Sequence, residues 1–364
     1  MTGPGHALRR LLARAVGFDL DHTLAVYNDC VVNAVAWRET RSRLIHHNLP
    51  RAGQLPRRYP GEPIVRGLFI DLVSGTLCKT DAFGRVLLEA PRGSLAPAST
   101  SPTRRTLTPK WPACFIVGSA FDMVTATLFP ALAPGVPPTA AQFVALCRTV
   151  REQLDAVHTR GTLKEYILAE TASCVRALTI SSAHLDMLRA TGRSLFVLTN
   201  SEPAYTIALL DYLFDGHTLP HWYDVFHTVV TGATKPQFFH ATGARGRRFE
   251  SISVRGACRV VAGGTAAELE SILDCRPRNI LYAGDHPLHD ISPAAGRGWK
   301  PVAILPERNH GRRHGPWGDP LRAGGSASWL EGACRADCLG IEPDAATFVE
   351  SLVDPGSVRR DTSD

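Results

Sequence analysis

Four short apolar runs, each ending in polar residues, limit the folds open to this chain more than any other feature of its sequence. They are rich in valine, isoleucine, leucine and phenylalanine, and a fifth run follows them. Such runs, separated by stretches of helical periodicity, are typical of strands buried on both faces of a parallel sheet. The five runs are Val16–Leu20, Ser194–Leu198, Val225–Val230, Asn279–Ala283 and Pro301–Leu305. The sequence therefore predicts an α/β fold.

A long stretch of chain between the first and second runs predicts an inserted domain. About 170 residues lie there, far more than a crossover helix needs. We expect a discontinuous core domain over residues 1–24 and 180–307 and an inserted domain over residues 25–179. Residues 308–364 are expected to form a segment rich in glycine, proline and arginine, followed by a tail.

Patterns inside the insertion predict its elements. Helices are expected over Ala34–His46 and about Thr139–His158, and extended segments near Gly67–Leu77 and Arg85–Glu89. Three stretches have no such pattern: Pro91–Pro112 is interpreted as a mobile loop, Asp354–Asp364 as a frayed end, and the arginine-rich stretch around Arg308, Arg312 and Arg313 is assigned no role.

The composition limits the classes of protein that the chain can belong to. Its 40 basic and 34 acidic residues give a formal charge of +6, and the basic residues, mostly arginine, are spread along the chain. This does not favour binding to nucleic acid, because no recognition motif or basic patch accompanies the charge. No window approaches the roughly 18 to 20 apolar residues that a membrane-spanning helix needs. We therefore expect no membrane partner, and a homo-oligomer is left open.

The cysteines favour the cytoplasm. Nine are scattered along the chain, and we expect no secretory leader before them. An odd, scattered set is typical of reduced thiols in a cytoplasmic protein. The spacing of Cys334 and Cys338 does not fit a structural zinc site.

Polar residues that carry chemistry follow each of the first four runs. Because the carboxyl ends of parallel strands meet at one edge of a sheet, we expect these residues to converge there. They are Asp19 and Asp21 after the first run, Thr199, Asn200 and Ser201 after the second, Lys235 after the third, and Asp285, with Asp290, after the fourth.

The residue types at that edge predict a phosphoryl-transfer site. Residues two apart on a strand point the same way, and paired carboxylates such as Asp19 and Asp21 repel each other unless a cation lies between them, which favours Mg²⁺. A lysine supplies a compact ammonium for an anion. The alternatives are that Asp19 only ends a strand, that Asp21 caps a helix and that Ser201 is an ordinary N-cap.

These motifs resemble those of the haloacid dehalogenase (HAD) superfamily and, within it, of the cytosolic purine 5′-nucleotidases and their nucleotidase-domain-containing relatives. The resemblance covers residues 15–307 and is carried by Phe18–Tyr27, Arg66–Asp71, His158–Glu165, Lys235–Phe239 and Gly284–Ile291. It implies a Rossmann-like HAD core with a large cap domain inserted between the first and second catalytic motifs.

The resemblance also implies a reaction and its catalytic residues. The chain would be a Mg²⁺-dependent 5′-nucleotidase that hydrolyses nucleoside 5′-monophosphates. Asp19 would be the nucleophile that forms an aspartyl-phosphate, and Asp21 the acid and base. The Asp19 carboxylate, the Asp21 main-chain carbonyl and Asp285 would hold Mg²⁺.

Four further residues receive roles by the same resemblance. Thr199, Asn200 and Lys235 would bind the phosphate oxygens, with Thr199 and Lys235 counted as catalytic. Asp290 would orient the metal's waters or Lys235 from behind the site.

Features of the inserted domain keep two alternatives open. Pro91–Pro112 stands where purine-specific members carry a charged stretch that holds the base. The chain could thus be a catalytically weak, nucleotide-binding regulatory protein, or a HAD phosphatase for sugar phosphates or phosphoproteins. Tyr27, Phe69 and Phe121 are candidates for stacking on a base, although each also fits a core position. Arg66 and Lys79 are interpreted as structural.

Overall fold

The structure, a computed structural model, describes residues 12–60, 64–98, 105–133, 139–159, 161–176, 178–240, 248–308, 316–323 and 326–353. The predicted frayed end Asp354–Asp364, Arg312, Arg313 and part of Pro91–Pro112 lie outside these residues. Within them the chain forms two compact units. The core unit contains the described residues of 12–27, 175–308 and 334–353, and the inserted unit those of 28–174 and 316–333.

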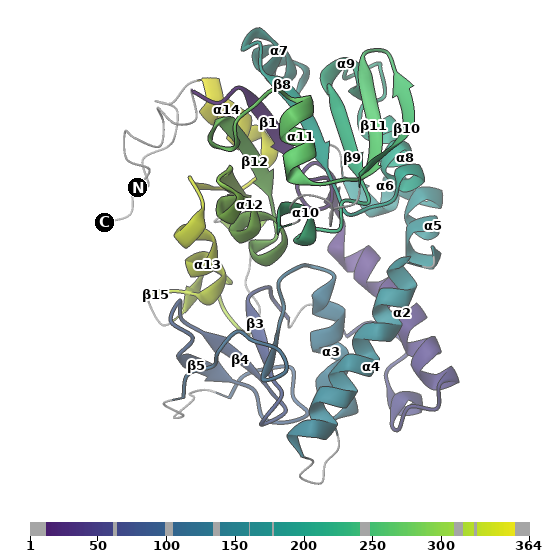
Figure 1. Ribbon diagram of the computed structural model, residues 1–364. Helices are drawn as coiled ribbons and strands as arrows, with labels where there is room; N and C mark the ends of the chain where they lie inside the picture. The colour runs from purple at the N-terminus through teal and green to yellow at the C-terminus, as the bar shows by residue number, and fades with distance from the viewer. Residues whose placement is uncertain are drawn as a thin grey trace. The chain divides into compact units, whose positions relative to one another are not determined.

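An eight-stranded sheet forms the centre of the core unit (Figure 1). Its neighbouring strands run parallel, except that β10 and β11 form an antiparallel hairpin at one edge. The strand order is β10 (Phe249–Arg255), β11 (Cys258–Gly263), β9 (Thr228–Thr231), β8 (Ser194–Leu198), β1 (Ala15–Phe18), β12 (Ile280–Gly284), β13 (Lys300–Ile304) and β16 (Ile341–Glu342). The predicted α/β fold with a parallel sheet is confirmed.

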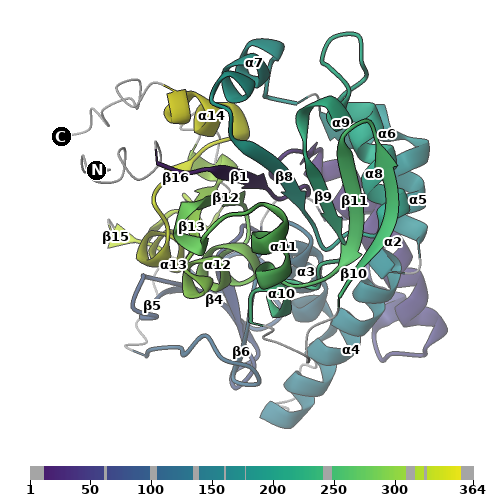
Figure 2. The same cartoon turned by 45° about the horizontal axis from the view of Figure 1, so that its top comes forward.

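Helices pack on both faces of this sheet (Figure 2). They are α7 (Ser182–Ala190), α8 (Pro203–Leu213), α9 (Trp222–Val225), α10 (Gln237–His240), α11 (Ala266–Ile272), α12 (Ser292–Arg297) and α14 (Ala345–Val353). Short turns lie at Pro277–Asn279, Pro287–Ile291 and Pro306–Arg308, and β2 (Val26–Tyr27) pairs with β7 (Val175–Arg176). Helix α13 covers Trp329–Asp337.

The central strand β1 is buried along its whole length by neighbouring elements. Phe18 packs edge-on against Phe348 of α14, with ring centroids 5.7 Å apart. Gly17 instead lies beneath the ring of Phe196 on β8, where any Cβ would collide with that ring. The glycine is therefore required by the close approach of its neighbour, and it lets β1 pass through the middle of the core.

Some predicted strands differ from those observed. The run Val225–Val230 is divided between α9 and β9, because Val225 and Phe226 are buried at the end of a helical turn and only later residues join the sheet. The hairpin strand β10 was not predicted, since its residues are mostly exposed and its pattern is not that of a buried strand. The neighbouring β11 was also missed.

The inserted unit has a four-stranded antiparallel sheet and its own apolar core. The strand order is β5 (Val86–Glu89), β4 (Thr76–Thr80), β3 (Leu68–Asp71), β6 (Cys114–Ile116). The helices are α2 (Asp29–His46), α3 (Asp122–Leu132), α4 (Ala140–Thr159), α5 (Thr162–Ala169) and α6 (Thr171–Cys174), with a turn at Ala52–Gln54 and a small hairpin of β14 (Arg322–Ala323) and β15 (Ser326–Ala327). No helix in the described residues is long and apolar enough to cross a membrane.

The segment predicted as a separate C-terminal part is instead divided between the units. Trp317 is fully buried in the core of the inserted unit, and its indole donates to the carbonyl of Leu95 at 2.8 Å. Lys79 donates to the carbonyls of Trp317 and Asp319, at 2.7 and 2.5 Å. Burial lowers the pKa of Lys79 to about 8. Further along, β16 extends the sheet of the core unit.

Candidate active site

The residues predicted to carry the chemistry lie at the carboxyl ends of the central strands of the core unit. Asp19 directly follows β1, and Asp285 directly follows β12. Thr199 follows β8, and Lys235 lies in the loop after β9. Asp290 stands in the turn Pro287–Ile291.

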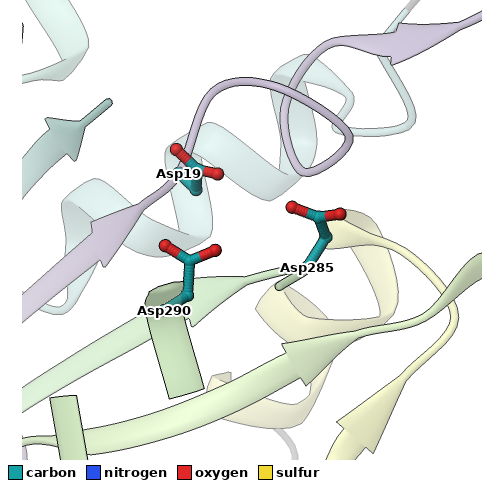
Figure 3. A group of neighbouring side chains, drawn as sticks. All are labelled: Asp19, Asp285 and Asp290. Atoms are coloured by element: carbon teal, nitrogen blue, oxygen red, sulfur yellow. The ribbon is translucent and has the colours of Figure 1, made fainter. Parts of the chain in front are cut away.

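Three carboxylates converge at this edge (Figure 3). One carboxylate oxygen from each of Asp19, Asp285 and Asp290 lies within 4.8 Å of the other two. The three residues are buried, with exposed fractions of 6, 4 and 1%, respectively. Among the described residues, no other group of three histidine, cysteine or acidic residues has this geometry. Hard oxygen ligands at such separations suit Mg²⁺, and a divalent cation would offset their mutual repulsion. The residues present therefore fit the ion that the motifs imply.

Lys235 is the cation that the structure places in this cluster. Its ammonium lies 2.8 Å from Asp19 Oδ1 and 2.6 Å from Asp290 Oδ1. It also donates to the Leu198 carbonyl at 3.2 Å. Burial alone would lower the pKa of Lys235, but the two carboxylates raise it above the ordinary value. The side chain therefore carries its positive charge in the site.

Burial and the neighbouring carboxylates oppose ionisation of Asp19, and the Lys235 ammonium favours it. Burial raises the pKa of Asp19 well above the ordinary value. The Lys235 ammonium opposes that effect, whereas the carboxylates of Asp290 and Asp285 add to it. One ammonium among three carboxylates leaves an excess of negative charge, which is the electrostatic condition that a divalent cation relieves.

Tyr282 belongs to this cluster and was not found from the sequence. It lies on β12, is fully buried, and its hydroxyl accepts from Lys235 at 2.9 Å. The same hydroxyl lies 3.0 Å from Asp290 Oδ1 and 3.2 Å from the Leu198 carbonyl, to either of which it can donate. A tyrosine inside an otherwise apolar strand was the available signal, because a buried hydroxyl needs a partner.

Asp290 is held so that it contacts Lys235, and its role in orienting Lys235 or the metal's waters stays a prediction. Its Oδ2 accepts from the main-chain N–H of His286 at 3.1 Å, while Oδ1 faces the ammonium. The close packing depends on Gly284, because a Cβ at that position would lie 2.6 Å from the Asp290 Cβ.

A Gly284→Ala substitution is therefore expected to push Asp290 away from Lys235 and to lower the free energy of unfolding by about 1–3 kcal/mol. The measurement is urea unfolding in the presence of a chelator. Gly296→Ala is the matched control, because nothing lies within 4 Å of a Cβ there and alanine favours helix α12. Equal stability of the two variants would contradict this account of Gly284.

Thr199 and Asn200 lie at the same edge, but their side chains are engaged with the protein. The Asn200 amide donates to the Lys235 carbonyl at 3.2 Å and accepts from the Lys235 N–H at 2.6 Å. The hydroxyl oxygen of Thr199, which is fully buried, accepts from the Ser201 N–H at 3.0 Å. Asn200 thus fixes the main chain at Lys235, and contact of either residue with phosphate stays a prediction.

The Asp21 carboxylate lies outside the cluster of three and is bound by hydroxyl groups. Tyr27 donates to its Oδ1 at 2.6 Å and Ser201 to its Oδ2 at 2.8 Å. The alternatives considered for Asp21 and Ser201 are wrong. Helix α2 begins at Asp29 with Asn28 as its N-cap, and Glu202, not Ser201, is the N-cap of α8. The predicted metal contact of Asp21, through its main-chain carbonyl, stays a prediction.

The candidates for base stacking are packed within their own units. Tyr27 is 3% exposed and is bonded to Asp21. Phe69 is fully buried edge-on against Trp329, and Phe121 packs against the ring of His158 at 5.0 Å. Each of the three therefore has a packing role in the structure.

Comparison with known proteins identifies the family. A family model described as the 5′ nucleotidase family matches residues 8–311. The chain belongs to the 5′ nucleotidase family. The resemblance found from the motifs is thereby confirmed for that family, and the matched region contains every residue of the candidate site.

Two relatives of this 5′ nucleotidase family member share about a quarter of their aligned residues with it. The 5′-nucleotidase domain-containing protein 2 of Rattus norvegicus is 25% identical over 321 residues, which are 80% of this chain and 56% of the relative. The Homo sapiens protein of that name is 24% identical over 319 residues, 80% of this chain and 60% of the relative. The chain thus spans less than two thirds of the length of these relatives.

A solved structure is similar over most of the chain. It is a HAD-superfamily hydrolase, subfamily IA, variant 1, from Geobacter sulfurreducens PCA, with 12% identity and a TM-score of 0.39 over 94% of this chain and 97% of the other. The family assignment rests on the family model instead.

Proposed function

We propose that the chain is a Mg²⁺-dependent phosphomonoester hydrolase, a 5′-nucleotidase that acts on nucleoside 5′-monophosphates through an aspartyl-phosphate on Asp19. The observation that carries this proposal is the buried contact of Asp19 with Lys235 beside Asp285 and Asp290. Membership of the 5′ nucleotidase family supports the same reaction class.

Magnesium would be held by the Asp19 and Asp285 carboxylates and the main-chain carbonyl of Asp21. When bound, the ion would offset the charge of the phosphate and reduce its repulsion from the nucleophile. Lys235, 2.8 Å from Asp19, favours the ionised carboxylate that attack requires.

In the first step, an oxygen of Asp19 attacks phosphorus, and the bond from phosphorus to the leaving alcohol oxygen breaks. Asp21 gives a proton to that oxygen, so that an alcohol leaves. In the second step Asp21 removes a proton from water, the water oxygen attacks phosphorus, and the bond to Asp19 breaks. Thr199, Asn200 and Lys235 stabilise the charge on the phosphoryl oxygens in both steps.

The two alternatives differ from this proposal in substrate or in turnover. A phosphatase for sugar phosphates or phosphoproteins would use the same residues, and a regulatory nucleotide-binding protein would keep them without useful turnover.

We also propose a cytoplasmic location, which is supported by the absence of disulfides among the nine cysteines, all of which the structure describes.

The test is phosphate release from a panel of nucleoside 5′-monophosphates and sugar phosphates, with Mg²⁺ and with a chelator. We expect the highest kcat/KM for a nucleotide and a loss of at least about a hundredfold on chelation, reversed by excess Mg²⁺. Release that chelation leaves unchanged would contradict the metal's role. Preference for a sugar phosphate would favour the first alternative, and nucleotide binding without turnover would favour the second.

A further inference from the structure

Both oxygens of the Asp21 carboxyl group accept from hydroxyl donors, one of them six residues away in the sequence and the other 180 residues away. Tyr27 of β2 donates to Oδ1 at 2.6 Å, and Ser201, in the loop after β8, donates to Oδ2 at 2.8 Å. Two bonds, one to each oxygen, restrict both the direction and the plane of the carboxyl group. Each oxygen keeps a lone pair, so the group can carry a proton without losing either bond.

A second phenol holds the first. The Tyr27 and Tyr205 hydroxyl oxygens lie 2.7 Å apart. Tyr27 has one proton and directs it to Asp21, so Tyr205 is the donor in this pair. Tyr205 lies on helix α8, Tyr27 lies on a strand paired with β7, and both are 3% exposed. In this series of hydrogen bonds from Tyr205 through Tyr27 to Asp21, the two tyrosines are therefore held by regular elements of the core unit.

Burial of the two phenols does not by itself require the contact with Asp21. A buried hydroxyl needs at least one partner, and the two tyrosines supply that to each other. The additional bond, at 2.6 Å, has the short length of a hydroxyl that donates to a carboxylate. Its effect is to aim a carboxyl group that would otherwise rotate about its side-chain bonds.

We propose that Tyr27, held by Tyr205, and Ser201 are positioning residues that aim the Asp21 carboxyl group at the oxygen of the leaving alcohol. This deepens the function proposed above and rests on it, because Asp21 acts there as the acid. Loss of either hydroxyl leaves the nucleophile Asp19 and its contact with Lys235 in place. The defect should therefore appear only where the leaving group needs a proton.

Two substrates distinguish a defect in protonating the leaving group from a general loss of activity. The alcohol of a nucleoside 5′-monophosphate must be protonated as it leaves, whereas the leaving group of p-nitrophenyl phosphate departs as a stable anion. The kcat/KM value reports the steps through phosphoryl transfer to Asp19. We expect Tyr27→Phe to lower kcat/KM for the nucleotide by about tenfold or more, and for p-nitrophenyl phosphate by less than about twofold.

Matched variants test the same pattern. Tyr205→Phe should give a smaller loss with the same preference, and Ser201→Ala should resemble Tyr27→Phe, while Ser201→Thr, which keeps a hydroxyl, should restore activity. Tyr223→Phe is the control, because that residue lies on α9, before β9 begins, and packs on His221, so its loss should change neither value. In an Asp21→Asn background, Tyr27→Phe should add no further loss.

The outcomes separate this inference from the proposed function. Equal losses on both substrates, or no loss on either, in variants that fold as the wild type does would overturn the positioning role and leave the hydrolase intact. A wild-type protein inactive on both substrates would overturn the proposed function and the inference together. If Tyr27→Phe does not fold, the comparison of Ser201→Ala with Ser201→Thr decides by the same criterion.

Discussion

Replacing Asp19 by asparagine is expected to lower kcat for nucleoside monophosphate hydrolysis by about 10⁴-fold or more. The amide has nearly the same shape but cannot form the phosphoryl ester, so the whole covalent route is lost. The measurement is phosphate release under saturating substrate and Mg²⁺. Substrate binding should persist, since the phosphate contacts proposed for Lys235 and its neighbours remain.

The control for that substitution is Asp186→Asn. The Asp186 side chain, on helix α7 of the same unit, is 74% exposed, and its loss should leave kcat unchanged. An Asp19→Asn protein that retains more than about a tenth of the wild-type kcat would contradict the assignment of the nucleophile.

Replacing Lys235 by methionine is expected to lower the free energy of unfolding by about 3–5 kcal/mol, because it leaves the buried carboxylates of Asp19 and Asp290 without their cation. The ammonium that is lost lies 2.8 and 2.6 Å from them. Urea unfolding in the presence of a chelator measures this, so that no added metal can substitute for the lysine. Activity should fall as well, because the contact with the phosphoryl oxygens is lost.

A double variant shows whether electrostatics is the cause. Adding Asp290→Asn to Lys235→Met removes one of the uncompensated charges, so the double variant should be more stable than the sum of the two single effects predicts. Strict additivity, or a loss below about 1 kcal/mol for Lys235→Met alone, would show that the ion pair does not hold this edge of the sheet together.

The parts of the fold that the sequence predicted are those whose burial is visible in short windows. Strands such as β1 and β12 are buried along their whole length, so each appears as an apolar run. Strand β10 was missed because it is an edge strand with mostly exposed side chains. Strand β16 is too short for any pattern, at two residues, and its place beside β13 depends on long-range packing.

The candidate site was predicted wherever a residue follows a strand end. Asp19, Lys235 and Asp285 converge because the parallel sheet brings those ends together. Tyr282 and Tyr205 were not identified as site residues, and Ser201 was given no catalytic or binding role, since their importance comes from tertiary hydrogen bonds. Tyr27 was considered as an aromatic surface for a base or as a core residue, and its hydroxyl was overlooked, because a phenol's stacking face and its hydroxyl cannot be ranked from the sequence.

The C-terminal segment shows why composition was a weak guide there. Glycine, proline and arginine favour irregular structure, and no periodicity suggested a place for Trp317. In the structure that indole fills part of the apolar core of the inserted unit, and Lys79 binds the main chain beside it. Such a segment gains its structure from a surface formed by distant residues.

The most direct test of the covalent mechanism is transfer of label from a nucleoside 5′-monophosphate with ³²P in its phosphate. Wild-type protein, mixed with this substrate and Mg²⁺ and quenched in acid within one turnover, should carry ³²P that hydroxylamine releases, as expected of an acyl phosphate, and Asp19→Asn protein should carry none. Turnover without labelled wild-type protein, or equal labelling of the Asp19→Asn variant, would contradict the account.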